Sequence, residues 1–372
     1  MTRSATALAG MVLLVVVGGT AHSQDAGPTP AADRARTPQA KSAAEWRAAV
    51  PDIRRRMELV MGALPGPEKR VPLDVEVVAE ERTERYLRRK LRYTPEPGDR
   101  VPAWLLVPHA ASRAAPAAAV LCLHQTNSVG KDEPAGLGGL ENLHYARELA
   151  ERGIVCLVPD YPSFGEYPYD FKAPAHGHAS GSIKAVWNNL RAVDLLVALP
   201  EVDPARIGVI GHSLGGHNAL FTAAFDERIV AVVTSCGFTP FPDYYGGAVK
   251  GWTSDRYMPR IRDTYGLDAA RIPFDFPELV AGLAPRALFS NSPVGDDNFA
   301  VGGVGRAFAE ALPVHRLFDG EPGVAPVAER LVLETPTCGH DFPPVVRRRA
   351  YEWLGLRLAP RSAPPDRAHE EP

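Results

Sequence analysis

Residues 206–225 read RIGVIGHSLGGHNALFTAAF, an apolar run of strand length followed at once by an apolar run of helix length. The turn between the two runs is GHSLG, residues 211–215, which matches the pattern Gly-x-Ser-x-Gly. Such a sharp turn brings backbone close to backbone, so it needs glycine where a Cβ atom would clash. It places a serine hydroxyl at the end of the strand and directs the next amide toward an incoming oxyanion. This context predicts that Ser213 is a nucleophile and that the Leu214 amide is an oxyanion-hole donor.

Five other apolar runs have the length of a buried strand. They are AAVLCLH, GIVCLVPDY, IVAVVTSC, RALFSN and RLVLETP. Helices are expected at 45–62, 140–153 and 182–199. This alternation of strand and helix predicts an α/β domain with a mostly parallel central sheet and helices on both faces. The β-branched runs between residues 71 and 108, broken by a Pro-Gly-Asp turn signal, predict antiparallel strands that lead into the sheet.

Residues 238–276 interrupt this alternation just before the strand run RALFSN. The segment is rich in aromatic residues, proline and glycine. We expect it to form an insertion over the active face of the sheet. Most of its aromatic side chains would pack the insertion onto the domain, and a few would line a substrate cleft.

A serine hydroxyl needs a general base before it becomes a strong nucleophile. In enzymes with this turn, the partners follow in the order serine, acid, histidine. Of the eleven histidines, His315, His340 and His369 lie late enough in the chain. His340 stands in TCGHDFP, directly after the last strand run, whereas His315 falls in a helical or pre-strand segment and His369 in the terminal tail. We therefore predict that His340 is the general base.

The acid that holds the other imidazole nitrogen should follow the preceding strand run, RALFSN. Residues 292–298 read SPVGDDN there and offer two carboxylates. Asp296, the first after the glycine turn, is the preferred acid, and Asp297 is its rival.

The second oxyanion donor should come from the loop after VLCLH. This loop begins with His124, Gln125 and Thr126. The Thr126 amide is the preferred donor and the Gln125 amide its rival. His124 is expected to fix the loop through hydrogen bonds.

The two ends of the chain differ from the part between them. Residues 1–23 carry a basic residue, an apolar run at 8–17 and small residues beyond it, which is typical of a secretory signal peptide. That run is too short to span a bilayer, which needs about 20 residues in a helix. The sequence thus predicts an exported protein, periplasmic or extracellular, with no membrane span in the mature chain. Residues 24–44 are expected to form a flexible leader, 45–357 the catalytic domain and 358–372 a disordered tail.

Composition excludes several classes of partner. A hydrophobic content of 45% is enough for one large core. The formal net charge of −3 is too mild to indicate binding to nucleic acid or to an anionic membrane. The arginine run at 347–349 is interpreted as the solvated face of the last helix. His176 and His178 have no further metal ligands beside them in the sequence, and we predict neither a metal nor a cofactor.

The four cysteines form two groups. Cys122 and Cys156 lie in apolar strand runs, where a buried free thiol is the expected state. Cys236 and Cys338 lie near strand ends on the active face, and an oxidising compartment can join such a pair. The sequence leaves open whether they form a disulfide.

The chain from about residue 100 to residue 357 resembles the α/β hydrolase superfamily, and more narrowly its dienelactone hydrolase and acetyl xylan esterase-like branch. The segments that carry this resemblance are VLCLHQTNSVGKDEPAGLGG, LAERGIVCLVPDYPSFGEY, AVDLLVALPEVDPARIGVIGHSLGGHNAL and TPTCGHDFP. The resemblance implies hydrolysis of a small-molecule or saccharide carboxylic ester through an acyl-enzyme. Dienelactone hydrolases proper have cysteine where this chain has Ser213.

Two alternatives of other classes remain. The chain also resembles the catalytic domain of prolyl oligopeptidases, although residues 24–100 are too few for their propeller. A serine peptidase is therefore the first alternative. A non-catalytic binding protein that keeps the α/β hydrolase fold is the second.

Overall fold

The computed structural model describes residues 37, 39–173 and 177–360 of the chain. The expected signal peptide at 1–23 lies outside the described residues, as do most of the expected leader, His176 and His369. Of the expected tail, only residues 358–360 are described. None of the described helices is both long and apolar enough to cross a membrane.

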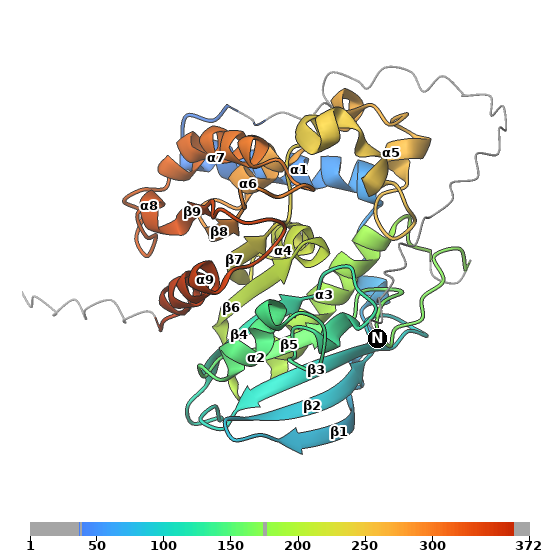
Figure 1. Cartoon of the computed structure of the whole chain (residues 1–372), viewed down its shortest axis with the longest axis vertical. Helices are drawn as coiled ribbons and strands as arrows, with labels where there is room; N and C mark the ends of the chain where they lie inside the picture. Colours follow the sequence, from blue (N-terminus) through green and yellow to red (C-terminus); the bar gives the residue numbers. More distant parts are fainter. Residues whose placement is uncertain (1–36, 38, 174–176, 361–372) are drawn as a thin grey trace, which may run out of the picture.

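A single mixed sheet crosses the described part of the chain (Figure 1). Its strands are β1 (Glu76–Arg82), β2 (Tyr86–Tyr93), β3 (Val101–Pro108), β4 (Ala117–Leu123), β5 (Val155–Pro159), β6 (Val202–His212), β7 (Ile229–Ser235), β8 (Ala287–Asn291) and β9 (Leu331–Glu334). They lie in the order β1-β2-β3-β5-β4-β6-β7-β8-β9. The pairs β1/β2, β2/β3 and β3/β5 are antiparallel and all the others are parallel. The predicted parallel sheet with antiparallel strands leading into it is confirmed.

Helices cover both faces of the sheet, as predicted. On one face lie α1 (Ala43–Met61), α3 (Gly181–Ala198), α4 (Leu214–Phe225), α6 (Phe276–Gly282) and α7 (Val301–Arg316), and on the other lie α2 (Tyr145–Ala150) and α9 (Pro344–Arg357). Successive side chains of a strand point to opposite faces. In β4, Leu121 belongs to the hydrophobic cluster of the first face and Cys122 to that of the second. The sheet is therefore held between two hydrophobic cores.

The helix predicted at 140–153 is shorter and interrupted. A 3₁₀ turn occupies Glu141–Leu143, and α2 begins only at Tyr145. The N–H groups of Ala146 and Arg147 donate to the carbonyl of Pro134 at 3.0 and 3.1 Å. Because these two amides bind a carbonyl of the preceding loop, they are not available to a helical turn that starts earlier.

Arg347 contradicts the interpretation of residues 347–349 as a solvated face. Its side chain is buried, and its Nε and Nη2 donate to the Glu148 carboxylate at 2.9 and 3.1 Å. This ion pair ties α9 to α2, which packs on the same face of the sheet. Arg349 does meet the expectation, since its side chain is 59% exposed. The sequence pattern does not show which side of α9 packs against α2, so it could not distinguish the buried Arg347 from the exposed Arg349.

The segment 238–276 contains short helices and turns. They are 3₁₀ helices at Phe241–Gly247, Val249–Trp252 and Ala269–Arg271, and the single turn α5 (Arg260–Asp263). The ring of Trp252 lies 5.7 Å from the rings of both Phe241 and Phe276, between centroids. All three rings are buried, so they pack the segment onto the domain. The remaining short helices are Pro67–Lys69, Gly130–Asp132 and α8 (Val327–Arg330).

Candidate active site

Ser213 is the single residue between β6 and α4. Its backbone has φ 53° and ψ −116°, a conformation that non-glycine residues rarely adopt. Its N–H donates to the carbonyl of Ser235 at 2.8 Å, and its carbonyl accepts from the N–H groups of Gly216 and His217. The strained backbone is therefore held by β7 on one side and by the first turn of α4 on the other.

The two glycines of the motif allow this turn to form. A Cβ atom on Gly211 would lie 2.1 Å from the carbonyl oxygen of Gly215. A Cβ atom on Gly215 would lie 1.9 Å from the carbonyl oxygen of Leu123, at the end of β4. Both distances are far inside van der Waals contact, so larger residues would push α4 away from the sheet. The clash expected from the motif is present at both positions.

His340 and Asp296 contact each other across two neighbouring loops. The Nδ1 atom of His340 lies 2.9 and 3.0 Å from the two carboxylate oxygens of Asp296. Asp296 follows β8 and His340 follows β9, and the amides of Val294 and Gly295 donate to carbonyls of the second loop at 3.0 Å. Asp297 is exposed. Of the two candidate acids, the structure thus brings Asp296 and not Asp297 to the imidazole.

The surroundings of Asp296 keep its carboxylate charged. Its side chain is 1% exposed, and burial alone would raise its pKa. The hydrogen bond from His340 and the amides of Asn298 and Phe299 outweigh this effect and lower the pKa. An ionised Asp296 accepts the Nδ1–H of His340, which leaves Nε2 of the ring as the basic nitrogen.

His340 lies beside the turn that carries Ser213. Its ring is 4.9 Å from the ring of His212, the residue immediately before Ser213, in an edge-on arrangement. The His340 ring also lies 6.0 Å from the Phe299 ring, between centroids. Burial, and then the nearby His340, lower the pKa of His212 to about 3. His212 therefore stays neutral, and its Nδ1 is paired with the Ser235 hydroxyl at 2.9 Å.

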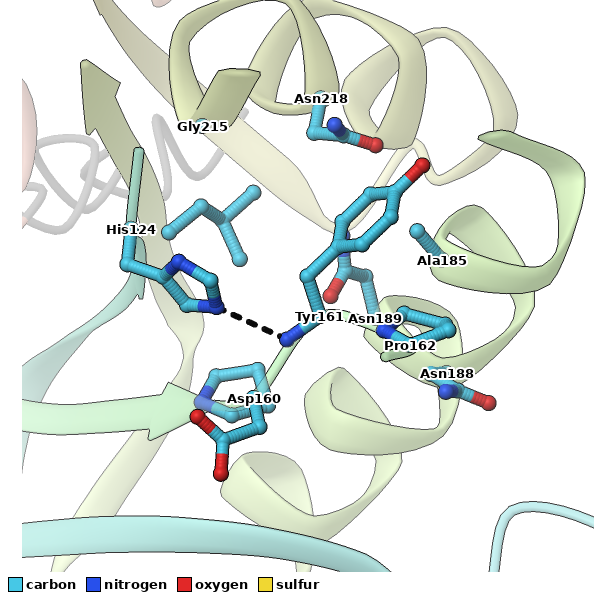
Figure 2. A pocket seen from close by; sticks show the side chains of 11 residues that line it. His124, Asp160, Tyr161, Pro162, Ala185, Asn188, Asn189, Gly215 and Asn218 are labelled. Carbon is cyan, nitrogen blue, oxygen red and sulfur yellow. Dashed lines mark hydrogen bonds between the residues drawn. The ribbon is translucent and has the colours of Figure 1, made fainter. Parts of the chain in front are cut away.

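The loop after β4 is fixed by hydrogen bonds from several directions. The Nδ1 of His124 lies 2.6 Å from the carbonyl oxygen of Gln125, and its Nε2 accepts from the Tyr161 N–H at 2.9 Å, the dashed line in Figure 2. Burial lowers the pKa of His124, which agrees with one nitrogen donating and the other accepting. The Gln125 and Asn127 side chains both donate to the Glu133 carboxylate, at 3.1 and 2.6 Å. The predicted role of His124 in fixing the loop is confirmed.

The backbone amides of Thr126 and Leu214 are available to bind a ligand. Neither N–H donates a backbone hydrogen bond to a described residue. Thr126 is on the loop after β4, and Leu214 is the first residue of α4. Because β4 and β6 are adjacent parallel strands, their carboxyl ends bring these two amides to the same edge of the sheet. The Gln125 N–H, the rival donor, likewise makes no backbone hydrogen bond with a described residue, and the Gln125 carbonyl lies 2.6 Å from His124 Nδ1.

A small cavity lies behind this loop (Figure 2). His124 and Gly215 line it together with polar residues of the loop after β5, of α3 and of α4, among them Asp160, Asn188 and Asn218. Its volume is about 10 Å³. That is the space of about one water molecule. This cavity is therefore too small to hold a substrate.

The metal-ligating side chains near the site fit an ion poorly. Cys236, Asp296 and His340 offer ligand atoms that all lie within 4.8 Å of one another. Burial, and then the charge of Asp296, raise the pKa of the Cys236 thiol, and metals bind the thiolate. The Asp296 carboxylate and His340 Nδ1 are already bonded to each other. His178 instead pairs with Glu96, at 2.8 Å.

The cysteines are all free thiols. Cys122 and Cys156 are buried, as predicted. Cys236 is buried and Cys338 partly exposed, and they do not form a disulfide with each other. The Cys236 Sγ instead donates to the carbonyl of Asp341 at 3.4 Å, next to His340.

One residue of the site was not singled out in the sequence. The Tyr257 hydroxyl lies 3.0 Å from the Thr126 hydroxyl and comes from the 238–276 insertion. It is one of several aromatic residues of this segment, and no sequence motif distinguishes it from the others. The only available signal was the expectation that a few of these residues would reach the cleft.

Comparisons with known proteins agree with this architecture. A family model described as the alpha/beta hydrolase family matches residues 134–369. The putative hydrolase YtaP of Bacillus subtilis is 29% identical over 192 residues, which cover 49% of this chain and 62% of YtaP. The chain spans less than two thirds of the length of the curated relatives that it matches first.

Solved structures show the same fold over most of the chain. A glucuronoyl esterase from Solibacter usitatus aligns with a TM-score of 0.67 at 19% identity, over 85% of this chain and 94% of that one. A putative acetyl xylan esterase from Bacteroides fragilis aligns with a TM-score of 0.57 at 19% identity, over 89% of this chain and 86% of that one. At such identities the likeness shows the fold. Together with the matching family model, it shows that this chain belongs to the alpha/beta hydrolase family.

Proposed function

We propose that this chain is a serine hydrolase that cleaves carboxylic esters through an acyl-enzyme formed on Ser213. The observation that carries the proposal is the hydrogen-bonded pair of Asp296 and His340 beside the strained turn of Ser213. A buried ionised carboxylate, an oriented imidazole and a serine at a strand-to-helix turn are the parts that nucleophilic acyl transfer needs.

The proposed mechanism assigns one role to each group. The Ser213 hydroxyl attacks the ester carbonyl while His340 Nε2 accepts its proton, and Asp296 stabilises the resulting imidazolium. The amides of Leu214 and Thr126 bind the oxyanion, with Gln125 as the rival second donor. His340 then gives its proton to the leaving alcohol. A water molecule activated by the same imidazole releases the acid.

Esters of carbohydrates are the proposed substrates. The solved structures of the same fold include proteins named glucuronoyl esterase and acetyl xylan esterase. We also infer export through a signal peptide at 1–23, a leader at 24–44, a catalytic domain at 45–357 with an insertion at 238–276, and a tail at 358–372.

Two measurements on the purified protein test the proposed activity. A fluorophosphonate probe should label the wild-type protein and not the Ser213→Ala variant. Hydrolysis of aryl acetates and acetylated saccharides should likewise require Ser213. Cleavage of peptide amides in place of esters would favour the peptidase. Absence of both labelling and hydrolysis would favour a binding protein.

A matched pair of substitutions tests the acid. Asp296→Asn removes the charge that orients His340, and we expect kcat to fall by about 10⁴-fold. Asp297→Asn makes the same chemical change at the neighbouring exposed residue, and we expect kcat to change by less than about threefold. Equal losses in the two variants would contradict the assignment of Asp296.

A further inference from the structure

We propose that Tyr257 is a positioning residue that holds the Thr126 amide in place for oxyanion binding. This inference rests on the proposed function, because it assigns a role to Tyr257 within the same site. The contact that carries it is the hydrogen bond between the Tyr257 and Thr126 hydroxyls, at 3.0 Å. Either hydroxyl can be the donor.

The loop that carries Thr126 is held from two sides. Behind it, the side chains of Gln125 and Asn127 both bind Glu133. These bonds fix the residues before and after Thr126 but not its own side chain. Tyr257 reaches Thr126 from the insertion, which is remote in sequence. The insertion therefore supplies the second support of the loop.

Tyr257 is itself firmly anchored. Its carbonyl accepts from the Ser182 N–H at 3.2 Å, and the carbonyl of Asp255 accepts from the Gly181 N–H at 2.8 Å. Both amides belong to the first turn of α3, where backbone N–H groups need acceptors from outside the helix. The Tyr161 hydroxyl donates to the carbonyl of Arg256. The backbone around Tyr257 is thus fixed to α3 and to the loop after β5.

The ring of Tyr257 also packs near the nucleophile. Its centroid is 6.1 Å from the ring of His217, one turn along α4 from Ser213, and 6.3 Å from the ring of Trp252. Burial lowers the pKa of His217 to about 3, so this neighbour stays neutral. The ring therefore rests on uncharged aromatic groups, and the hydroxyl is the polar end that meets Thr126.

The hydrogen bond between the Tyr257 and Thr126 hydroxyls should stabilise the transition state more than the bound substrate. An oxyanion-hole donor acts only if it points at the position where negative charge develops. A net hydrogen bond in a folded protein contributes about 0.5–1.5 kcal/mol, which corresponds to about twofold to tenfold in rate. Because the Thr126 amide remains when either hydroxyl is removed, the loss should stay within this range. It should lower kcat and leave KM nearly unchanged.

A double-mutant cycle tests the inference. We expect Tyr257→Phe and Thr126→Val each to lower kcat by about twofold to tenfold, and the double variant to lower it no further than the larger single loss. Thr126→Ser keeps a hydroxyl and should recover most of the activity that Thr126→Val loses. Affinity for a trifluoromethyl ketone, which forms an oxyanion with Ser213, should fall by the same factor as kcat in each variant.

Thr253→Val is the matched control. Thr253 lies in the same insertion and its hydroxyl donates to the Lys250 carbonyl instead, at 2.8 Å, so we expect the same Thr-to-Val change there to leave kcat unchanged. Additive losses in the double variant, or no loss in Thr126→Val, would overturn the inference. Wild-type protein without Ser213-dependent hydrolysis would overturn the proposed function itself. The two failures are therefore distinguishable.

Discussion

Two buried clusters near the active edge of the sheet are built from different side chains. The ionic cluster consists of Lys131 with Asp160, at 3.2 Å, and of Lys184 with Glu96 and Asp99, at 2.5 and 2.6 Å; both lysines are 0% exposed. It joins the loops around β3, β4 and β5 to α3. The aromatic cluster consists of Phe238, Phe241, Trp252, Phe274 and Phe276, and it holds the 238–276 insertion and α6.

The two clusters hold different parts of the candidate active site in place by different physical means. Each charge of the ionic cluster was taken out of water, so its partner must be at the right distance and direction. That requirement suits the loops beside Thr126, where a donor has to point at one position. The aromatic cluster has few polar atoms and mainly fills space, so other apolar side chains of similar total volume can fill it as well. Such packing is sufficient for the insertion, because it has to hold the segment on the domain and does not have to fix the direction of each ring.

The largest expected effect is the loss of one charge from the ionic cluster. Lys184→Met keeps most of the side chain's volume and leaves Glu96 and Asp99 buried without their lysine. We expect the free energy of unfolding to fall by about 3–5 kcal/mol in urea denaturation. Lys69→Met is the control, because Lys69 also contacts Glu96 but its side chain is 33% exposed, and its loss should cost less than about 1 kcal/mol. Equal losses of unfolding free energy in the two variants would contradict the idea that burial makes the Lys184 ion pairs more important than the Lys69 one.

Acid should weaken the ionic cluster next. Burial alone would raise the pKa of Glu96, but His178 and Lys184 outweigh it and lower the pKa to about 2. A carboxyl whose pKa is lowered by folding stabilises the protein above its unfolded pKa of 4.5, and this contribution is lost as pH falls toward 2. The loss should be on the order of 3 kcal/mol at most. The difference in unfolding free energy between wild type and Glu96→Gln should therefore shrink below pH 4.5; a constant difference would contradict this.

Replacing one apolar residue by another in the aromatic cluster should cost less stability. Phe274→Leu replaces one buried apolar group by another, and we expect the free energy of unfolding to fall by about 1–1.5 kcal/mol. Thermal and urea unfolding would measure it beside Lys184→Met. A loss as large as that of the lysine variant would show that the aromatic cluster is as demanding of geometry as the ionic one.

The smallest effect is expected for an ion pair on the surface. Arg349 lies 3.0 Å from Glu334, and the two side chains are 59% and 27% exposed. Arg349→Gln should change the free energy of unfolding by less than about 0.5 kcal/mol, because water and salt screen the pair. A change above 1 kcal/mol would indicate that exposure is a poor guide to the ion pairs of this protein.

The fold was predictable because its signals are local. Apolar runs of strand length, separated by helix-length segments, were enough to predict the parallel sheet. The glycines of GHSLG were enough to predict the turn at Ser213. The failures concern contacts between distant segments. The broken helix near residue 144 depends on the carbonyl of Pro134, and the burial of Arg347 depends on Glu148, and no local pattern reports either partner.

The amino-acid sequence by itself determined the sheet, the turn and the strand ends on which Ser213, Asp296 and His340 stand, because hydrophobic period and turn chemistry act over a few residues. Only the tertiary structure decided which of two adjacent aspartates meets the imidazole and that Tyr257 reaches Thr126. These contacts join residues far apart in the chain, and their geometry is set by how the loops and the insertion pack. The types of residue in the site can therefore be predicted from the sequence, whereas the contacts between them are set by the folded chain.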